Sequence, residues 1–273
     1  MTGLEELAAG GRNLRPAAEE DDLSLASTLM RGLAVLGCFQ SGTEALGNAE
    51  IARRLDLNRA TVSRLCKTLV ALDYLRADPS GGFRVTANVL TLAYPLLAAT
   101  GWRHAARPVM REIAEFANAA TSISVISGAN FVVIQSEGHP PDFPHTPEIG
   151  ITGPLMAAST GRALLSLLAE QSLKDKLAEL RELAPDGFAA FADATQAGIE
   201  RCRTDGFCTA RGDWRPAIHA VAAPIGRTAD GLVVALACTV PAYRARQDRM
   251  ETDIGPRLAA AAETLRLRGV FTP

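Results

Sequence analysis

Apolar residues recur at helical spacing in two short neighbouring stretches, residues 48–55 and 58–71. The first stretch is expected to bury Ile51, Ala52 and Leu55, and the second Val62, Leu65 and Leu69. The segment Asp56-Leu57-Asn58 between them predicts a tight turn. With a further apolar pattern over residues 28–39, this spacing predicts three helices that include a helix-turn-helix.

A hairpin is expected directly after these helices. Residues 74–78 and 83–86 have the composition of strands, and Pro79-Ser80-Gly81-Gly82 has that of a turn. A hairpin in this position is typical of a wing, which would set Arg76 or Arg84 beside a nucleic-acid backbone while Phe83 closes a small core. The alternative is a three-helix bundle with an ordinary hairpin and a solvated charged face.

The exposed faces of the second helix and the hairpin favour nucleic-acid binding. Short polar and guanidinium side chains in the first turns of a recognition helix can read base edges, and a cationic flank can contact phosphates. Residues 24–86 carry eight Lys or Arg against five acids, whereas the chain as a whole has a net charge of −2. Asn48 is expected to cap the first helix, and the second helix to open at Asn58. The predicted DNA-binding residues are Asn48, Asn58, Arg59, Thr61, Ser63, Arg64, Lys67, Arg76 and Arg84.

Composition limits the remaining possibilities. The 273 residues, 48% of them hydrophobic, suffice for two packed domains. No apolar run is long enough for a membrane span, and the acidic N-terminus is unlike a secretory signal, so a cytoplasmic location is expected. The five cysteines are an odd, scattered set, which is typical of core residues in a reducing compartment. The spacing of cysteines and histidines indicates no metal site, and no cofactor is expected.

The pattern divides the chain into four parts. Residues 1–23 are predicted to be a disordered tail, 24–87 a winged helix-turn-helix domain, 88–103 a linker helix containing Pro95, and 104–273 an α+β domain. The linker is so apolar that it needs a partner, either a second subunit or its own domain.

In the last part we expect one antiparallel sheet with helices on a face and a cupped side. A helix is expected from Arg107, with Pro108 in its first turn. Strands are predicted over 121–127, 130–137, 206–211, 218–225 and 232–239, and further helices over 172–183, 194–205 and 246–268.

At this point the chain resembles the IclR (isocitrate lyase regulator) family of transcription factors. The resemblance rests on RGLAVLGCF (31–39), AEIARRLDLNRATVSRLCKTLVALDYL (49–75), FRVTANVLTLAYPLL (83–97), GITGPLMAASTGRALLS (150–166), DGF (205–207) and IHAVAAPI (218–225). It implies a winged-helix head, a linker helix used in dimerisation and a GAF-like domain that binds a small organic effector. Such regulators commonly control the degradation of aromatic acids or small carboxylates, as dimers or tetramers. The expected partners are therefore operator DNA, a small effector and further copies of the chain.

The chain departs from the family pattern at two positions of the expected effector site. Ala210 and Ala220 stand where relatives that bind small acids are similar in placing polar ligand contacts, so a very small acid such as glyoxylate is disfavoured. A larger and more apolar pocket, suited to an aromatic molecule, is expected.

Helix ends, aromatic side chains and strand alternation indicate what would line this pocket. The amides at Ser159 and Thr160 begin a helix and could receive an anion, although plain helix capping is the alternative. The segment Asp213-Trp214-Arg215 could grip an aromatic ring, or only fix its loop. Of Cys238 and Thr239 one must face the cup, and Thr239 is favoured. The predicted effector-binding residues are Gly153, Pro154, Met156, Ser159, Thr160, Ala210, Trp214, His219, Ala220 and Thr239.

Two other classes of function compete with this one. The sequence has no nucleophile elbow, phosphate loop or dinucleotide fingerprint, so an enzyme is disfavoured, although His219, Asp213 and Cys208 could be imagined as a nucleophile set. A redox sensor using Cys208 and Cys238 would need a basic neighbour that lowers a thiol pKa, and Arg211 is the candidate.

Overall fold

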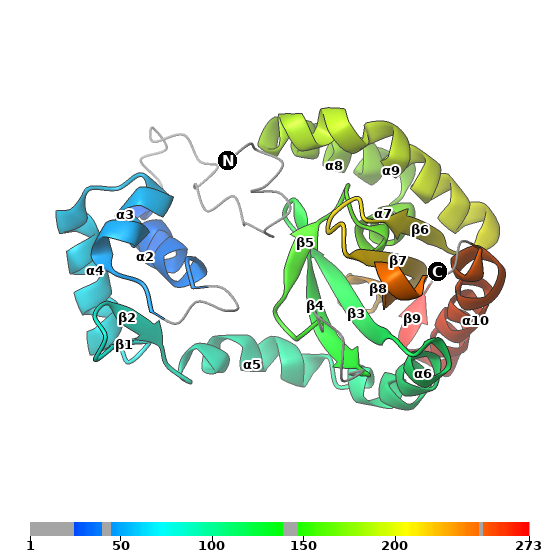
Figure 1. Ribbon diagram of the computed structural model, residues 1–273, viewed down its shortest axis with the longest axis horizontal. Helices are drawn as coiled ribbons and strands as arrows, with labels where there is room; N and C mark the ends of the chain where they lie inside the picture. Colours follow the sequence, from blue (N-terminus) through cyan, green and yellow to red (C-terminus); the bar gives the residue numbers. More distant parts are fainter. Residues whose placement is uncertain (1–24, 40–44, 139–146, 246–247, 273) are drawn as a thin grey trace. The chain divides into compact units, whose positions relative to one another are not determined.

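The computed structural model describes residues 25–39, 45–138, 147–245 and 248–272. The tail predicted for residues 1–23 lies outside this set. The described chain forms two compact units, and the division along the sequence falls between Thr100 and Gly101. Figure 1 shows the elements of both units.

The first unit contains a three-helix head and a hairpin. The elements are α2 (Ser27–Gly37), α3 (Asn48–Leu55), α4 (Arg59–Ala71), β1 (Leu75–Ala77) and β2 (Phe83–Val85) (Figure 1). The six apolar positions predicted for α3 and α4 are all buried, and Leu46, Leu75 and the half-buried Phe83 pack against them. The hairpin is antiparallel, with Arg76 opposite Arg84. The predicted winged helix-turn-helix is therefore confirmed.

The turn between α3 and α4 uses a left-handed residue. Asp56 ends α3 with φ 54° and ψ 43°, a conformation that Asp tolerates better than most residues. Asn58 then caps α4, because its side-chain oxygen accepts a hydrogen bond from the Thr61 amide at 2.7 Å. The capping role predicted for Asn48 is wrong: the chain enters α3 one residue earlier, Gly47 is the cap, and Asn48 is the first helical residue.

Residues 88–103, predicted as one linker helix, contain parts of two helices. Helix α5 (Val89–Ala99) includes Pro95, which supplies no backbone N–H, and none of its side chains is buried. After a break at Thr100 and Gly101, α6 (Trp102–Ala117) begins the second unit. The start predicted at Arg107 is wrong, and Pro108 lies inside α6. The half-buried Trp102 and the buried Ala106 extend the apolar face of this helix to the N-terminal side of the proline.

The second unit is built on one antiparallel sheet. Its strands follow the order β5 (Thr152–Pro154), β4 (Asn130–Glu137), β3 (Ala120–Ser127), β8 (Val233–Pro241), β7 (Ile218–Thr228) and β6 (Cys208–Arg211), and β9 (Phe271–Thr272) also pairs with β7. Every pairing is antiparallel. The hairpin predicted through Gly128-Ala129 is confirmed as β3 and β4. The short strands β5 and β9 carry too few residues for a recognisable alternation.

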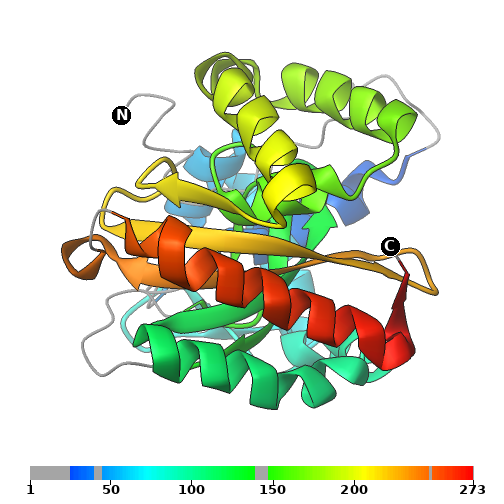
Figure 2. The ribbon, with the colours of Figure 1, turned by 90° about the vertical axis from the view of Figure 1, so that its right-hand side faces the viewer.

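The central strands separate two hydrophobic cores. On β8, Leu236 and Cys238 belong to one core and Ala235 and Ala237 to the other, as alternation along a strand requires. In Figure 2 helices lie both in front of the strands and above them. On one face lie α6 and α10 (Gly255–Leu265); on the other lie α7 (Ser159–Ser166), α8 (Glu170–Leu183) and α9 (Pro185–Asp205). The expectation of helices on one face is wrong, because β8 is apolar at consecutive positions and is buried on both faces.

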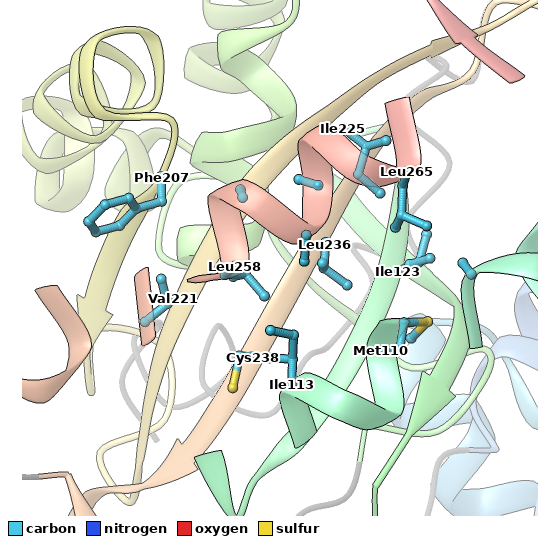
Figure 3. Close-up of a cluster of buried hydrophobic side chains, with 14 of the residues drawn as sticks. Met110, Ile113, Ile123, Phe207, Val221, Ile225, Leu236, Cys238, Leu258 and Leu265 are labelled. Atoms are coloured by element: carbon cyan, nitrogen blue, oxygen red, sulfur yellow. The ribbon is translucent and has the colours of Figure 1, made fainter. Parts of the chain in front are cut away.

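The core under α6 and α10 is dense and aliphatic. Figure 3 shows Leu236 of β8 near Leu258 of α10, with Met110 of α6 on the same side of the sheet. The last predicted helix, over residues 246–268, is a shorter α-helix, α10, between the π-helical turns Met250–Ile254 and Arg266–Val270. This core fixes β7 and β8 from behind and leaves their other face free to carry a cavity.

Candidate functional site

The predicted reading face of α4 is solvent-exposed and cationic. Arg59, Arg64 and Lys67 are exposed, and Thr61 and Ser63 are half-buried beside them. None of the three cationic side chains forms an ion pair with a residue in the described part of the chain. Because the opposite face of α4 buries Val62, Leu65, Cys66 and Leu69, the cationic face cannot turn inward without exposing the core.

The arginines of α3 already bind a carboxylate of the same helix. Glu50 accepts hydrogen bonds from Arg53 and Arg54, and these hydrogen bonds lower the pKa of Glu50 to about 2. Arg54 also donates to the Cys38 carbonyl at 2.9 Å. Asn48 lies at the N-terminus of the same helix, half-buried, and its side-chain oxygen has no hydrogen-bond partner among the described residues. The positive charge left for a polyanion is therefore concentrated on α4 and the wing.

The two arginines of the wing differ. Arg76 is exposed on β1, whereas Arg84 on β2 is half-buried and forms an ion pair with Asp78. Hydrogen bonds from Ser80 and Arg84 lower the pKa of Asp78 to about 2, so this carboxylate stays charged at neutral pH. Arg76 can contact a phosphate without breaking an ion pair of the wing, whereas Arg84 must first give up its ion pair with Asp78.

The second unit holds a cavity on the face of the sheet opposite α6 and α10. It is partly open to solvent, and the space between its walls, with that open part included, amounts to about 630 Å³. Its floor is a cross-strand row in which Ala210, Ala220 and Thr239 lie side by side on β6, β7 and β8. The described residues that line it are Ser122, Phe131, Val133, Pro147, Ile151, Ala157, Ala158, Ser159, Thr160, Ala210, Gly212, Asp213, Trp214, Arg215, Ile218, Ala220 and Thr239.

One wall of the cavity is the N-terminus of α7. Ser159 is fully buried and Thr160 is 6% exposed, and the helix has no side-chain cap. The Ser159 side-chain oxygen is buried without a hydrogen-bond partner among the described residues. Free backbone amides and the helix dipole make such a helix start favourable for an anion.

Another wall is a loop held by a buried arginine of α7. Arg162 on α7 is 4% exposed in its side chain and pairs with Asp213 at 2.7 Å. It also donates to the carbonyls of Met156 and Thr209. Gly198 on α9 leaves room for it, because a Cβ there would lie 2.6 Å from its Cδ. Asp213 is thus neutralised, and Arg215, whose pKa burial lowers, is the other charged residue among the described lining.

Six of the ten predicted effector-binding residues line the cavity: Ser159, Thr160, Ala210, Trp214, Ala220 and Thr239. Thr239 faces it while Cys238 packs in the opposite core, as strand alternation requires.

The other four lie outside the lining. Gly153 and Pro154 pair with β4 at the sheet edge, and Met156 packs in the core beneath α7. His219 alternates with Ala220 and projects to the far face, where burial and Arg211 lower its pKa against the opposing effect of Asp213 and Glu251.

Several lining residues were not predicted. Ser122 and Val133 could have been inferred from strand alternation once the face of each strand was known. Phe131 gave no such signal, since it begins a run of four consecutive apolar residues, 131–134, that shows no alternation. Arg162 lies outside the lining but holds one wall, and its signal was a charged residue inside the apolar block 161–165.

The redox and nucleophile alternatives fail on geometry. Cys208 pairs with Ala222 in the core under α7, whereas Cys238 pairs with Val221 in the opposite core, so the sheet separates the two thiols. Burial raises the pKa of the Cys238 thiol to about 12 despite the charge of Arg249. His219 likewise projects to the face opposite Cys208, because its cross-strand neighbour is Arg211.

Two other kinds of feature are absent from the described residues. No group of three or more His, Cys, Asp or Glu side chains in these residues is arranged to hold a metal ion. No helix in the same part of the chain has the length and apolar character that crossing a membrane requires.

Comparison with known proteins agrees with this architecture. Residues 28–79 match the IclR helix-turn-helix domain, and residues 96–266 match the family described as bacterial transcriptional regulator IclR C-terminal. The Pca regulon regulatory protein of Pseudomonas putida is 25% identical over 89% of this chain and 84% of its own length.

Solved structures agree as well. An IclR family transcriptional regulator from Brucella abortus is 31% identical, with a TM-score of 0.78 over 95% of this chain and 97% of its own. An IclR homolog from Microbacterium hydrocarbonoxydans in complex with 4-hydroxybenzoate has a TM-score of 0.65 over 89% of this chain and 100% of its own. At 21% identity this second likeness concerns the fold alone.

A winged helix-turn-helix followed by an α/β unit defines a DNA-binding transcriptional regulator. The family matches cover both units of the chain. The chain belongs to the IclR family, whose matched members are transcriptional regulators and not enzymes.

Proposed function

We propose that the protein is a ligand-responsive regulator that binds an operator as a homodimer or as a dimer of dimers, in the cytoplasm, with a small aromatic acid as its effector. The observation that carries the effector assignment is the cavity lined by Ser159, Trp214 and Thr239. It combines aromatic and aliphatic walls with the N-terminus of α7, which has no side-chain cap. The acid among its described lining residues, Asp213, already forms an ion pair with Arg162.

The charges of the cavity favour an anionic ligand. A carboxylate near Ser159 and Thr160 would meet amide donors and the positive end of the α7 dipole, while Trp214 and Phe131 offer ring edges and faces to an aromatic body. A cationic ligand would meet Arg215 and find no unpaired carboxylate among the described lining residues. The structure of the Microbacterium hydrocarbonoxydans relative, in complex with 4-hydroxybenzoate, points to the same chemical class.

The exposed surface of the first unit supports DNA binding by a dimer. Two copies of α4 could enter successive major grooves of an inverted repeat, with Arg59, Thr61, Ser63 and Arg64 toward base edges. Lys67, Arg76 and Arg84 would contact phosphates. Exposed apolar side chains on α5, including Leu90 at 69% and Tyr94 at 70%, provide a surface that a second subunit could cover.

The DNA assignment is tested on an operator that the protein itself selects from random duplex DNA. Arg64→Ala should weaken binding to this operator about tenfold or more and relax its sequence preference, because one bidentate base contact is worth about 1–3 kcal/mol. Lys174→Ala, on the exposed surface of α8, serves as a control of equal charge change. Equal affinity and preference in the wild type and Arg64→Ala would remove this residue from the reading surface.

The effector assignment is tested with benzoate and 4-hydroxybenzoate as probes. We expect a rise in melting temperature that grows with ligand concentration, since a ligand that binds the folded form stabilises it. Thr160→Phe should abolish this rise, because the added ring fills the space beside Ser159, while operator binding persists. A rise of the same size in Thr160→Phe would place the binding site outside this cavity.

A further inference from the structure

The indole of Trp214 is confined by its neighbours. Phe131 meets it edge to face, with ring centroids 5.6 Å apart and planes at 88°. The guanidinium carbon of Arg215 lies 4.4 Å from its centroid. A Cβ on Gly153 would lie 2.8 Å from the outer edge of the indole, at Cη2, so the ring occupies space that only glycine leaves open.

The backbone that carries Trp214 is also fixed. The Asp213 carboxylate accepts from Arg162 at 2.7 Å and from the Arg211 amide at 3.1 Å. On either side, the Gly212 amide donates to the Ile218 carbonyl and the Ile218 amide to the Arg215 carbonyl. The loop is therefore closed by its own hydrogen bonds and anchored to α7, and the indole has little freedom to turn.

The polar atom of this confined ring is unsatisfied. Trp214 Nε1 is buried and has no acceptor among the described residues, although an indole N–H can only donate. Buried donors without acceptors are rare and costly in folded proteins. The carboxylate nearest in sequence, that of Asp213, is already used by Arg162 and Arg211. A molecule in the cavity that Trp214 lines could supply the missing acceptor.

We propose that Trp214 determines effector specificity: its indole N–H donates to a second acceptor of the ligand, apart from the carboxylate at α7. The inference rests on the proposed function and narrows it to aromatic acids that bear a ring substituent with an acceptor oxygen, such as a ketone. Sites built around such a hydrogen bond reject analogues that lack the group, because the protein atom is then left buried and unpaired.

The test compares two ligand shapes that differ in one acceptor. 3- and 4-acetylbenzoate carry a carbonyl oxygen, and 3- and 4-isopropylbenzoate replace it with a methyl group. Calorimetric titration of the wild type should show at least one acetyl isomer binding about tenfold more tightly than its isopropyl analogue, which corresponds to about 1.4 kcal/mol. Trp214→Phe keeps an aromatic ring and should erase this preference. Trp102→Phe, which changes the other tryptophan in the opposite core, should keep it.

A second measurement does not depend on the stability of Trp214→Phe. In Trp102→Phe the chain retains one indole, so its N–H gives a single ¹H–¹⁵N signal. A new hydrogen bond should move this signal downfield with acetylbenzoate and not with isopropylbenzoate. Binding of both ligands with equal affinity and an unmoved indole signal would overturn the inference and leave the proposed function intact. Failure of every benzoate to bind would overturn both.

Discussion

Arg162 shows how one residue can organise a site without lining it. Its guanidinium reaches the Met156 carbonyl, the Thr209 carbonyl and the Asp213 carboxylate from a helix that is otherwise uncharged. A buried charge is tolerated only when its donors are satisfied and its charge is paired. Both conditions hold here, so Arg162 joins α7, β6 and the loop that carries Trp214.

We expect Arg162→Met to destabilise the second unit by about 3 to 5 kcal/mol, the usual cost of leaving the partner of a buried ion pair alone. The variant should also weaken benzoate binding, since the loop of Asp213 loses its anchor. Urea unfolding monitored by circular dichroism measures the first effect, and calorimetry the second. Lys174→Met breaks an exposed ion pair with Glu170 and should change the free energy of unfolding by less than about 1 kcal/mol. Similar losses in the two variants would contradict the role given to Arg162.

At the scale of the elements, the two arginines of the wing differ in their interactions, although the sequence predicted the same role for both. Both stand opposite each other in the hairpin, but Arg84 is paired with Asp78 and Arg76 is exposed. Removing one protein–phosphate interaction lowers the slope of log K against log salt by about 1. Arg76→Ala should produce this full reduction on the selected operator, and Arg84→Ala a smaller one. An equal or larger effect of Arg84→Ala would mean that DNA displaces Asp78.

The elements also show how far the sequence could predict the structure. Helices α3 and α4 were predictable because each packs one face on one small core, so periodicity and burial coincide. Strands β7 and β8 are buried at consecutive positions on both faces, and their apolar runs do not reveal which side faces the cavity. His219 and Ala220 were therefore both placed in the site, whereas the register admits one of them.

At the scale of the whole molecule, the exposed linker surface bears on DNA recognition. Helix α5 exposes Leu90, Leu92, Tyr94 and Leu96, and α2 in the same unit exposes Leu29 and Leu33. Exposed apolar side chains of this kind are typical of a surface that a partner covers. A head that binds alone reads one half-site, whereas two linked heads read both and gain affinity from the second as an intramolecular event.

We therefore expect Leu90→Glu to shift the protein toward the monomer, because a carboxylate in an apolar interface loses its solvation without a partner. Light scattering after size-exclusion chromatography measures the mass, and polarisation measures binding to the selected operator and to a single half-site. Affinity for the full operator should fall by about a hundredfold or more, within the range that linkage supplies, while half-site affinity stays constant. Leu267→Glu, at an exposed leucine of the second unit, is the control. A Leu90→Glu protein that stays dimeric would exclude Leu90 from the interface, and equal losses on both DNAs would mean that the substitution damages the head itself.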